Sequence, residues 1–326
     1  MKYLLLPLCL CLSVSLFSQG GGRTRTSLDT AWKFHFGHAS NPEKDFNYGL
    51  ANIFSKSGNS RNTAMDARFP DSSWRKVDLP HDWAVELPFA ASTDFDHASH
   101  GFKPVGGAYP ETSIGWYRKK FDVNPADSGK RFEVRFDGIF RDAKIWLNGF
   151  YLGNNLSGYV GVNYDVTDYI NFKGSNTLVV RADATQYEGW FYEGAGIYRH
   201  VWLDTYSNQH FADGGLFVKP TVKGKDAVIA LEAVLENRGL TSSDNNVSFY
   251  ITDRGGNVIG RSSSQRTILK ANETKMVNLS VPLRNARLWS LEDPYLYRVV
   301  AQVKSGNDVV DEVNLTNVSF IYNNSK

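Results

Sequence analysis

Residues 188–193 combine aromatic rings with carboxylates in one short segment that reads Glu-Gly-Trp-Phe-Tyr-Glu, and Gly194 and Gly196 follow it closely. The C–H face of a sugar ring stacks on an aromatic face, and a carboxylate accepts hydrogen bonds from sugar hydroxyls. The segment therefore predicts contacts to a sugar through four candidate residues: Glu188, Trp190, Tyr192 and Glu193. The alternative is that the aromatic rings pack in an interface and the acids are solvated.

A second group of reactive side chains lies at 94–100, where the sequence reads Asp-Phe-Asp-His-Ala-Ser-His. Aspartate and histidine bind metal ions, but these residues do not follow a spacing known for a metal site. The sequence also shows no Ser-His-Asp signature, phosphate-binding loop or zinc pattern. We therefore predict no metal site and no cofactor.

The composition is that of a soluble globular protein, with 326 residues of which 42% are hydrophobic and 21% are charged. The formal net charge of +2 gives no electrostatic reason to expect nucleic acid or membrane lipid as a partner. Residues 1–19 predict a secretory signal peptide, because Lys2 precedes an apolar run from Leu4 to Leu16 that is too short to span a bilayer. We therefore expect a secreted or periplasmic protein.

The elements that must position the candidate segment are strands, because apolar and polar residues alternate with a period of two, as in 132–136, 178–182 and 229–235. Asn148-Gly149 is typical of a two-residue hairpin, whose turn needs positive φ at both positions. Tryptophan nearly disappears after residue 215. We predict an all-β protein with a jelly-roll β-sandwich at 23–215 and an immunoglobulin-like β-sandwich at 216–320.

Five sequence blocks occur in a distinctive order. They are Leu-Pro-His-Asp-Trp at 79–83, Ile-Gly-Trp-Tyr-Arg-Lys-Lys-Phe at 114–121, Asp-Gly-Ile-Phe-Arg-Asp-Ala-Lys-Ile-Trp-Leu-Asn-Gly at 137–149, Gly-Ala-Gly-Ile-Tyr-Arg at 194–199 and Leu-Trp-Ser-Leu-Glu-Asp-Pro-Tyr-Leu-Tyr at 288–297. Together they resemble the N-terminal sugar-binding domain and the immunoglobulin-like second domain of family 2 glycoside hydrolases. This family includes β-galactosidases, β-glucuronidases and β-mannosidases. The resemblance covers about residues 27–313.

The resemblance implies a third domain in such enzymes, a (β/α)8 barrel of roughly 250 residues that carries the acid/base and nucleophilic glutamates. No acid of this sequence lies in a motif that matches this catalytic pair. We therefore assign no catalytic residue and expect no activity from the chain alone. In the family, a loop of the first domain reaches the pocket of the barrel just before the block at 194–199, which implies a substrate-binding role for residues 188–193.

The sequence is thus interpreted as the non-catalytic N-terminal portion of a secreted, retaining, β-galactosidase-like glycosidase that acts in carbohydrate breakdown. Its expected partner is a terminal β-linked sugar, bound in the context of a barrel domain. Two alternatives remain: a free-standing carbohydrate-binding β-sandwich protein, and a subunit that complements a separate catalytic barrel. An apolar surface meant for the barrel also predicts self-association.

Overall fold

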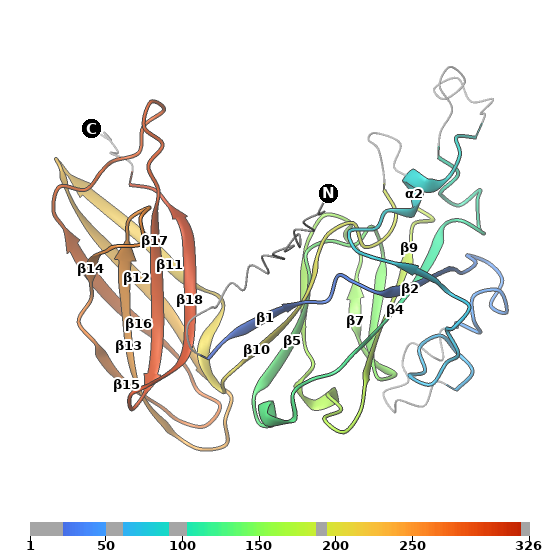
Figure 1. The fold of residues 1–326 in the computed structure, drawn as a ribbon, viewed down its shortest axis with the longest axis horizontal. Helices are drawn as coiled ribbons and strands as arrows, with labels where there is room; N and C mark the ends of the chain where they lie inside the picture. Colours follow the sequence, from blue (N-terminus) through green and yellow to red (C-terminus); the bar gives the residue numbers. More distant parts are fainter. Residues whose placement is uncertain (1–21, 50–60, 91–102, 187–193, 321–326) are drawn as a thin grey trace, which may run out of the picture.

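The computed structural model describes residues 22–49, 61–90, 103–186 and 194–320, which form two β-sandwiches that lie next to each other along the long axis of the molecule (Figure 1). All strand pairs of the named elements are antiparallel. The predicted all-β class, a jelly-roll sandwich followed by an immunoglobulin-like sandwich, is confirmed. None of the helices in the described ranges has the length and apolar character of a membrane span.

The N-terminal sandwich packs a four-stranded sheet, in the order β1-β10-β5-β8, against a six-stranded sheet, in the order β3-β2-β4-β9-β6-β7. Its strands are β1 (Thr24–Ser27), β2 (Trp32–Phe36), β3 (Arg75–Val77), β4 (Ile114–Phe121), β5 (Arg131–Phe136), β6 (Ala143–Leu147), β7 (Phe150–Asn155), β8 (Val162–Asp165), β9 (Asn176–Asp183) and β10 (Val201–Tyr206). Its short helices are α2 (Trp83–Glu86), η1 (Pro125–Asp127) and η2 (Thr167–Tyr169).

The C-terminal sandwich packs a three-stranded sheet, β11-β12-β16, against a five-stranded sheet in which β14-β13-β17-β18 lie in order and β15 also pairs with β13. Its strands are β11 (Gln209–Lys223), β12 (Asp226–Asn237), β13 (Ser243–Thr252), β14 (Val258–Arg261), β15 (Gln265–Leu269), β16 (Thr274–Leu283), β17 (Tyr297–Ser305) and β18 (Asp308–Val318).

The alternating pattern of the sequence accounts for both cores. Phe132, Val134 and Phe136 on β5 are buried in the N-terminal core, and their polar neighbours face away from it. Asn148 and Gly149 have φ values of 53° and 86° and join β6 to β7, so the predicted hairpin is confirmed.

The chain passes between the sandwiches at residues 207–208, between the end of β10 and the start of β11. The glycine pair at 214–215 lies inside β11, where the register shifts between Phe211 and Leu216. The domain boundary predicted between residues 215 and 216 therefore stays a prediction. Residue 215 lies within β11, which starts six residues earlier, at Gln209.

An irregular segment, of which residues 45–48 and 64–74 are in contact with the sheet, covers the outer face of the six-stranded sheet. Trp116 and Trp146 stack on that face with their ring centroids 5.8 Å apart. Asp45, from the irregular segment, accepts a hydrogen bond from the Trp116 indole at 2.7 Å and pairs with Arg181 at 2.9 Å. This cover gives the sheet a second core on its far side, so both faces of β4 and β9 are buried.

Candidate functional site

The four predicted sugar contacts, Glu188, Trp190, Tyr192 and Glu193, lie outside the described residues, as does the segment 94–100. What the structure does describe is how the chain is held on either side of 187–193. Among the described residues, no group of three or more histidine, cysteine, aspartate or glutamate side chains is arranged to hold a metal ion.

The segment 194–199, directly after the predicted sugar contacts, is fixed by backbone hydrogen bonds to two other blocks of the sequence. Gly196 and Phe140 exchange two backbone hydrogen bonds, with N–O distances of 2.6 Å and 2.8 Å. The His81 amide donates to the Ile197 carbonyl at 2.8 Å. Three of the blocks that carry the family resemblance therefore meet at one place.

Asp82 is the side chain that joins these blocks. Its Oδ1 accepts a hydrogen bond from the Ala84 amide at 2.9 Å, which caps the N-terminus of α2. The same oxygen accepts from the Ala195 amide at 2.8 Å. One carboxylate thus ties α2 to the end of the candidate segment. We call this assembly the loop base, which comprises residues 81–83, 140 and 194–197.

Gly196 is the tightest point of the loop base. Its φ of 119° is a conformation that residues with a side chain rarely adopt. A Cβ at this position would overlap the Tyr117 hydroxyl, lie 2.7 Å from the His81 carbonyl oxygen and lie 3.1 Å from the Trp83 ring. The Gly-Ala-Gly-Ile block therefore contains a glycine here for both conformational and steric reasons.

A buried polar network lies directly beneath the loop base. The Tyr117 hydroxyl lies 2.7 Å from His81 Nδ1. His81 Nε2 lies 3.2 Å from Glu86 Oε1, and Arg75 donates to the other oxygen of Glu86 at 2.6 Å. Burial lowers the pKa of His81 although Glu86 opposes the shift, so the imidazole is neutral at neutral pH. The network connects the backbone of the loop base to the surface at Arg75.

The chain is equally well held where it leaves β9 toward residue 187. The Asp183 carboxylate accepts from the Thr185 hydroxyl at 2.6 Å and amide at 3.1 Å, and it pairs with Arg181 at 3.0 Å. The Ala184 amide donates to the Ser113 carbonyl at 2.8 Å. The described chain on either side of residues 187–193 is therefore anchored on the six-stranded sheet and its neighbouring turns.

Exposed apolar side chains surround the loop base. Phe89, just after α2, and Tyr159, in the turn between β7 and β8, are 68% and 63% exposed. Tyr159 packs edge-on against Phe140, with 5.7 Å between the ring centroids, and the Tyr198 hydroxyl donates to the Gly158 carbonyl at 2.7 Å. The remaining large apolar side chains exposed in these two segments are Val85, Leu156 and Val160. Where such side chains form a contiguous patch, the patch marks a surface that another surface covers.

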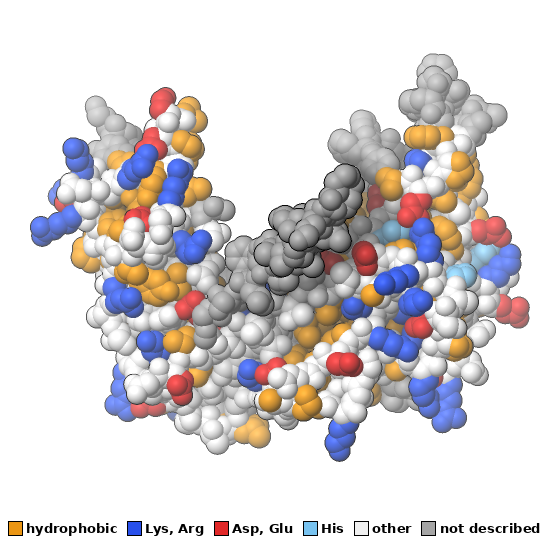
Figure 2. All heavy atoms as spheres, in the orientation of Figure 1, with side chains coloured by type: hydrophobic (Ala, Val, Ile, Leu, Met, Phe, Trp, Pro, Cys, Tyr) orange, Lys and Arg blue, Asp and Glu red, His pale blue; other side chains and the backbone are white. Residues whose placement is uncertain are grey.

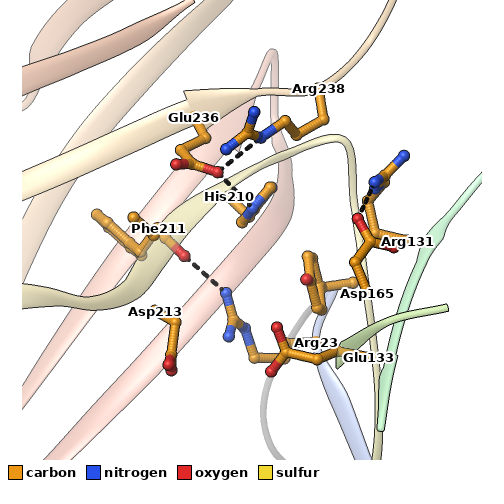
Figure 3. A pocket seen from close by; sticks show the side chains of 11 residues that line it. Arg23, Arg131, Glu133, Asp165, His210, Phe211, Asp213, Glu236 and Arg238 are labelled. Carbon is orange, nitrogen blue, oxygen red and sulfur yellow. Dashed lines mark hydrogen bonds and ion pairs between the residues drawn. The ribbon is translucent and has the colours of Figure 1, made fainter. Parts of the chain in front are cut away.

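A separate cavity of about 430 Å³ lies between the two sandwiches (Figure 3). Arg23 spans it: its guanidinium makes two hydrogen bonds with the fully buried Asp311, at 2.9 Å and 3.0 Å, and donates to the Phe211 carbonyl at 3.0 Å. Asp311 also accepts from the Phe211 amide at 2.8 Å. This cluster fastens the segment before β1 to β11 and β18.

The other charged groups around this cavity also face partners. Glu236 lies 2.8 Å from Arg238 and 3.5 Å from His210, and Arg131 pairs with Asp165. Burial lowers the pKa of His210. Because these charges neutralise one another, we assign no ligand to this cavity.

Two family models match the sequence, and together they cover nearly all of the described residues. The model "Glycosyl hydrolases family 2, sugar binding domain" matches residues 26–206, and "Glycosyl hydrolases family 2" matches residues 209–317. The chain belongs to glycoside hydrolase family 2. The resemblance of the five blocks is thereby confirmed, and the loop base belongs to the sugar-binding domain.

Relatives of known sequence agree with this family. A β-galactosidase of Bacteroides ovatus is 32% identical over 303 residues, which are 92% of this chain and 32% of that protein. A β-glucuronidase of Formosa agariphila is 26% identical over 270 residues, 76% of this chain and 27% of that protein. The chain therefore spans about a third of the length of these family 2 relatives.

Solved structures show the same arrangement. A family 2 member from Bacteroides cellulosilyticus superposes with a TM-score of 0.73 at 29% identity, covering 90% of this chain and 36% of that one. A β-glycosidase from Bacteroides vulgatus superposes with a TM-score of 0.71 at 26% identity, covering 91% and 34%. The matched part is the non-catalytic portion of a glycosidase.

Sequence reasoning proposed the candidate segment, which stays a prediction, and it gave no role to the side chains that hold the chain next to it. His81 and Asp82 belong to the block at 79–83, which was recognised as a family motif without a role for either residue. Tyr117 was recognised in the same way. The only signal for the network was a histidine within the block at 79–83, and such a histidine is more often a core residue than a functional one.

Proposed function

We propose that this chain supplies one wall of the sugar site of a secreted, retaining, β-galactosidase-like glycosidase. Glu188 and Trp190 are the principal contacts to a terminal β-linked sugar, with Tyr192 and Glu193 beside them. The observation that supports this proposal is the loop base, where the blocks at 79–83, 137–149 and 194–199 meet and hold the C-terminal end of the candidate segment. Such anchoring positions a binding segment on a rigid scaffold.

A (β/α)8 barrel that carries the two catalytic glutamates would complete this site. The apolar side chains exposed around the loop base support this proposal, because a barrel docked there would cover them. In the absence of a barrel, the same surface would cause the chain to self-associate. The relatives include β-galactosidases and β-glucuronidases, so the terminal sugar is a β-linked hexose or hexuronate.

The proposal also includes export through the signal peptide at 1–19. Expression of the full chain in a bacterial host, followed by N-terminal sequencing of the periplasmic fraction, tests this part. A mature protein that begins after Ser18 or Gln19 is expected. A full-length chain that stays in the cytoplasm would refute export but would leave the sugar site untouched.

Weak sugar binding distinguishes the proposal from a free-standing carbohydrate-binding protein. One wall offers a few hydroxyl hydrogen bonds of about 0.5–1.5 kcal/mol each and one stacking contact of similar size. After the cost of association, the expected dissociation constant for galactose or lactose is millimolar or weaker. A preformed groove in a dedicated binding protein would do better with an oligosaccharide.

The test is an NMR titration of the purified chain with lactose, with the α-linked disaccharide maltose as the control ligand. We expect weak, lactose-specific shifts that disappear in Trp190→Ala, while the melting temperature stays unchanged. Micromolar binding of a glycan that Trp190→Ala abolishes would refute the one-wall proposal in favour of the free-standing protein. Shifts that are equal for the two sugars would refute any specific site at this segment.

A further inference from the structure

The outer face of the sheet β14-β13-β17-β18, in the C-terminal sandwich, is polar and hollowed. A depression of about 820 Å³ lies over the four strands. Strand register places Arg261, Tyr250, Val300 and Asn314 in one row across the sheet, each on a neighbouring strand. Lysine and arginine side chains are prominent over the front of this sandwich, where β17 and β18 lie nearest the viewer (Figure 2).

Three basic side chains line this depression: Arg261, Arg298 and Lys304. None of them forms an ion pair with a carboxylate of the described residues, whereas most arginines of the N-terminal sandwich do. Arg261 instead lies over the Tyr250 ring, 4.9 Å from its centroid. The depression therefore holds three basic groups against one carboxylate, that of Glu312, and its excess charge is positive although the chain as a whole is nearly neutral.

The same depression also offers hydrogen-bond donors and acceptors. Gln302 donates to Glu312 at 2.7 Å, and Asn314 lies beside the other oxygen of that carboxylate at 3.4 Å. Glu312 is 7% exposed, and these two hydrogen bonds fix the position of its carboxylate within the face. A sugar hydroxyl can donate to this carboxylate, whereas a polymer of phosphates has no hydroxyl groups along its charged backbone to do so. Tyr250 adds an aromatic edge.

The spacing of the basic groups sets the length of the ligand. Arg298 and Lys304 project from the same face of β17 and are six residues apart, which is about 20 Å at 3.3 Å per residue. A single sugar cannot contact both. Strands lie about 4.8 Å apart, so Arg261 is about two strands from β17 and widens the positive area sideways. The face therefore suits an extended anionic chain.

We propose that this face binds an acidic oligosaccharide, a glycan whose sugars carry carboxylate or sulfate groups. Arg298 and Lys304 pair with anionic groups along the chain, and Arg261 pairs with one at the side. Gln302, Asn314 and Glu312 bond the hydroxyls between them. This second site lies on a different domain from the loop base, and its test is independent of the proposed function.

The test is calorimetry of the purified full chain with a hexasaccharide of galacturonic acid in low-salt buffer. A sulfated chondroitin hexasaccharide tells whether carboxylate or sulfate is preferred, and cellohexaose is the neutral control. We expect binding of at least one acidic hexasaccharide, weakened by added salt, and no binding of cellohexaose. Arg298→Gln and Lys304→Gln should each weaken binding about two- to fivefold, the usual value of one exposed charge pair.

The control is Lys219→Gln, which replaces an exposed lysine on β11 of the opposite sheet, whereas Lys304 is half-buried; this control should leave binding unchanged. Weakening by Lys219→Gln equal to that by Lys304→Gln would show that net charge alone attracts the ligand and would overturn the proposal. Tighter binding of a single-stranded DNA hexamer than of either acidic hexasaccharide would overturn it in favour of a nucleic acid. Absence of binding to both acidic hexasaccharides at low salt would also overturn it.

Discussion

Replacement of Gly196 by alanine tests the packing of the loop base. Alanine at a positive φ costs about 1–2 kcal/mol, and overpacking of a closely packed site costs a further 1–3 kcal/mol. The added methyl group would overlap the Tyr117 hydroxyl and press on the His81 carbonyl and the Trp83 ring. We expect Gly196→Ala to lower the free energy of unfolding by about 2–5 kcal/mol.

Comparison with a second glycine of the same sandwich separates the steric cost at Gly196 from the cost of its backbone conformation. Gly129 has a φ of 92°, and a Cβ there would meet no atom within 4 Å. Gly129→Ala should therefore cost only about 1–2 kcal/mol, from backbone strain alone. Urea unfolding followed by tryptophan fluorescence measures both variants, because the N-terminal sandwich holds most of the tryptophans. Equal destabilisation by the two substitutions would refute the described packing around Gly196.

Three further results follow from the same region. Asp82→Ala removes the acceptor for two backbone amides and should lower the free energy of unfolding by about 2–3 kcal/mol, with faster hydrogen exchange at Ala195. Asp82→Asn keeps an acceptor and should cost less than half as much. Equal costs would contradict the role of Asp82 in joining α2 to Ala195. Burial lowers the pKa of His81, so its contribution to stability is complete above the unfolded-state pKa of about 6.5 and declines as the pH falls below it. His81→Gln should flatten the stability profile below about pH 6.5, and an unchanged slope would argue against a buried neutral imidazole. Phe89→Glu combined with Tyr159→Glu should reduce self-association measured by light scattering, and a wild-type chain that is monomeric at every concentration would argue against a surface that needs a cover.

Local sequence patterns predicted much of the fold because strands and tight turns depend on neighbouring residues. The alternation at Phe132, Val134 and Phe136 places these side chains in the core, and Asn148-Gly149 forms the predicted turn. Both features follow from a period of two and from the φ values that asparagine and glycine tolerate. The order of the five blocks was sufficient to indicate the family.

Contacts between distant parts of the chain could not be predicted in this way. The Arg23–Asp311 pair joins residues 288 positions apart, and the His81–Tyr117 hydrogen bond joins residues 36 apart. Nothing in the local pattern of either partner specifies the other. The sequence also gave no indication that Asp45 and its irregular segment cover the outer face of a sheet, because polar segments without periodicity are usually solvated loops.

A single assay tests most directly the prediction that this chain alone does not catalyse glycoside hydrolysis. The measurement is hydrolysis of 4-nitrophenyl β-galactoside and 4-nitrophenyl β-glucuronide by the highly purified 326-residue chain. We predict no turnover above the buffer blank, because retaining hydrolysis needs two carboxylates about 5 Å apart across the glycosidic bond, and no acid of this chain lies in a motif that matches the family's catalytic pair. Turnover that copurifies with the chain and is lost when one of its own acids is replaced would contradict this prediction.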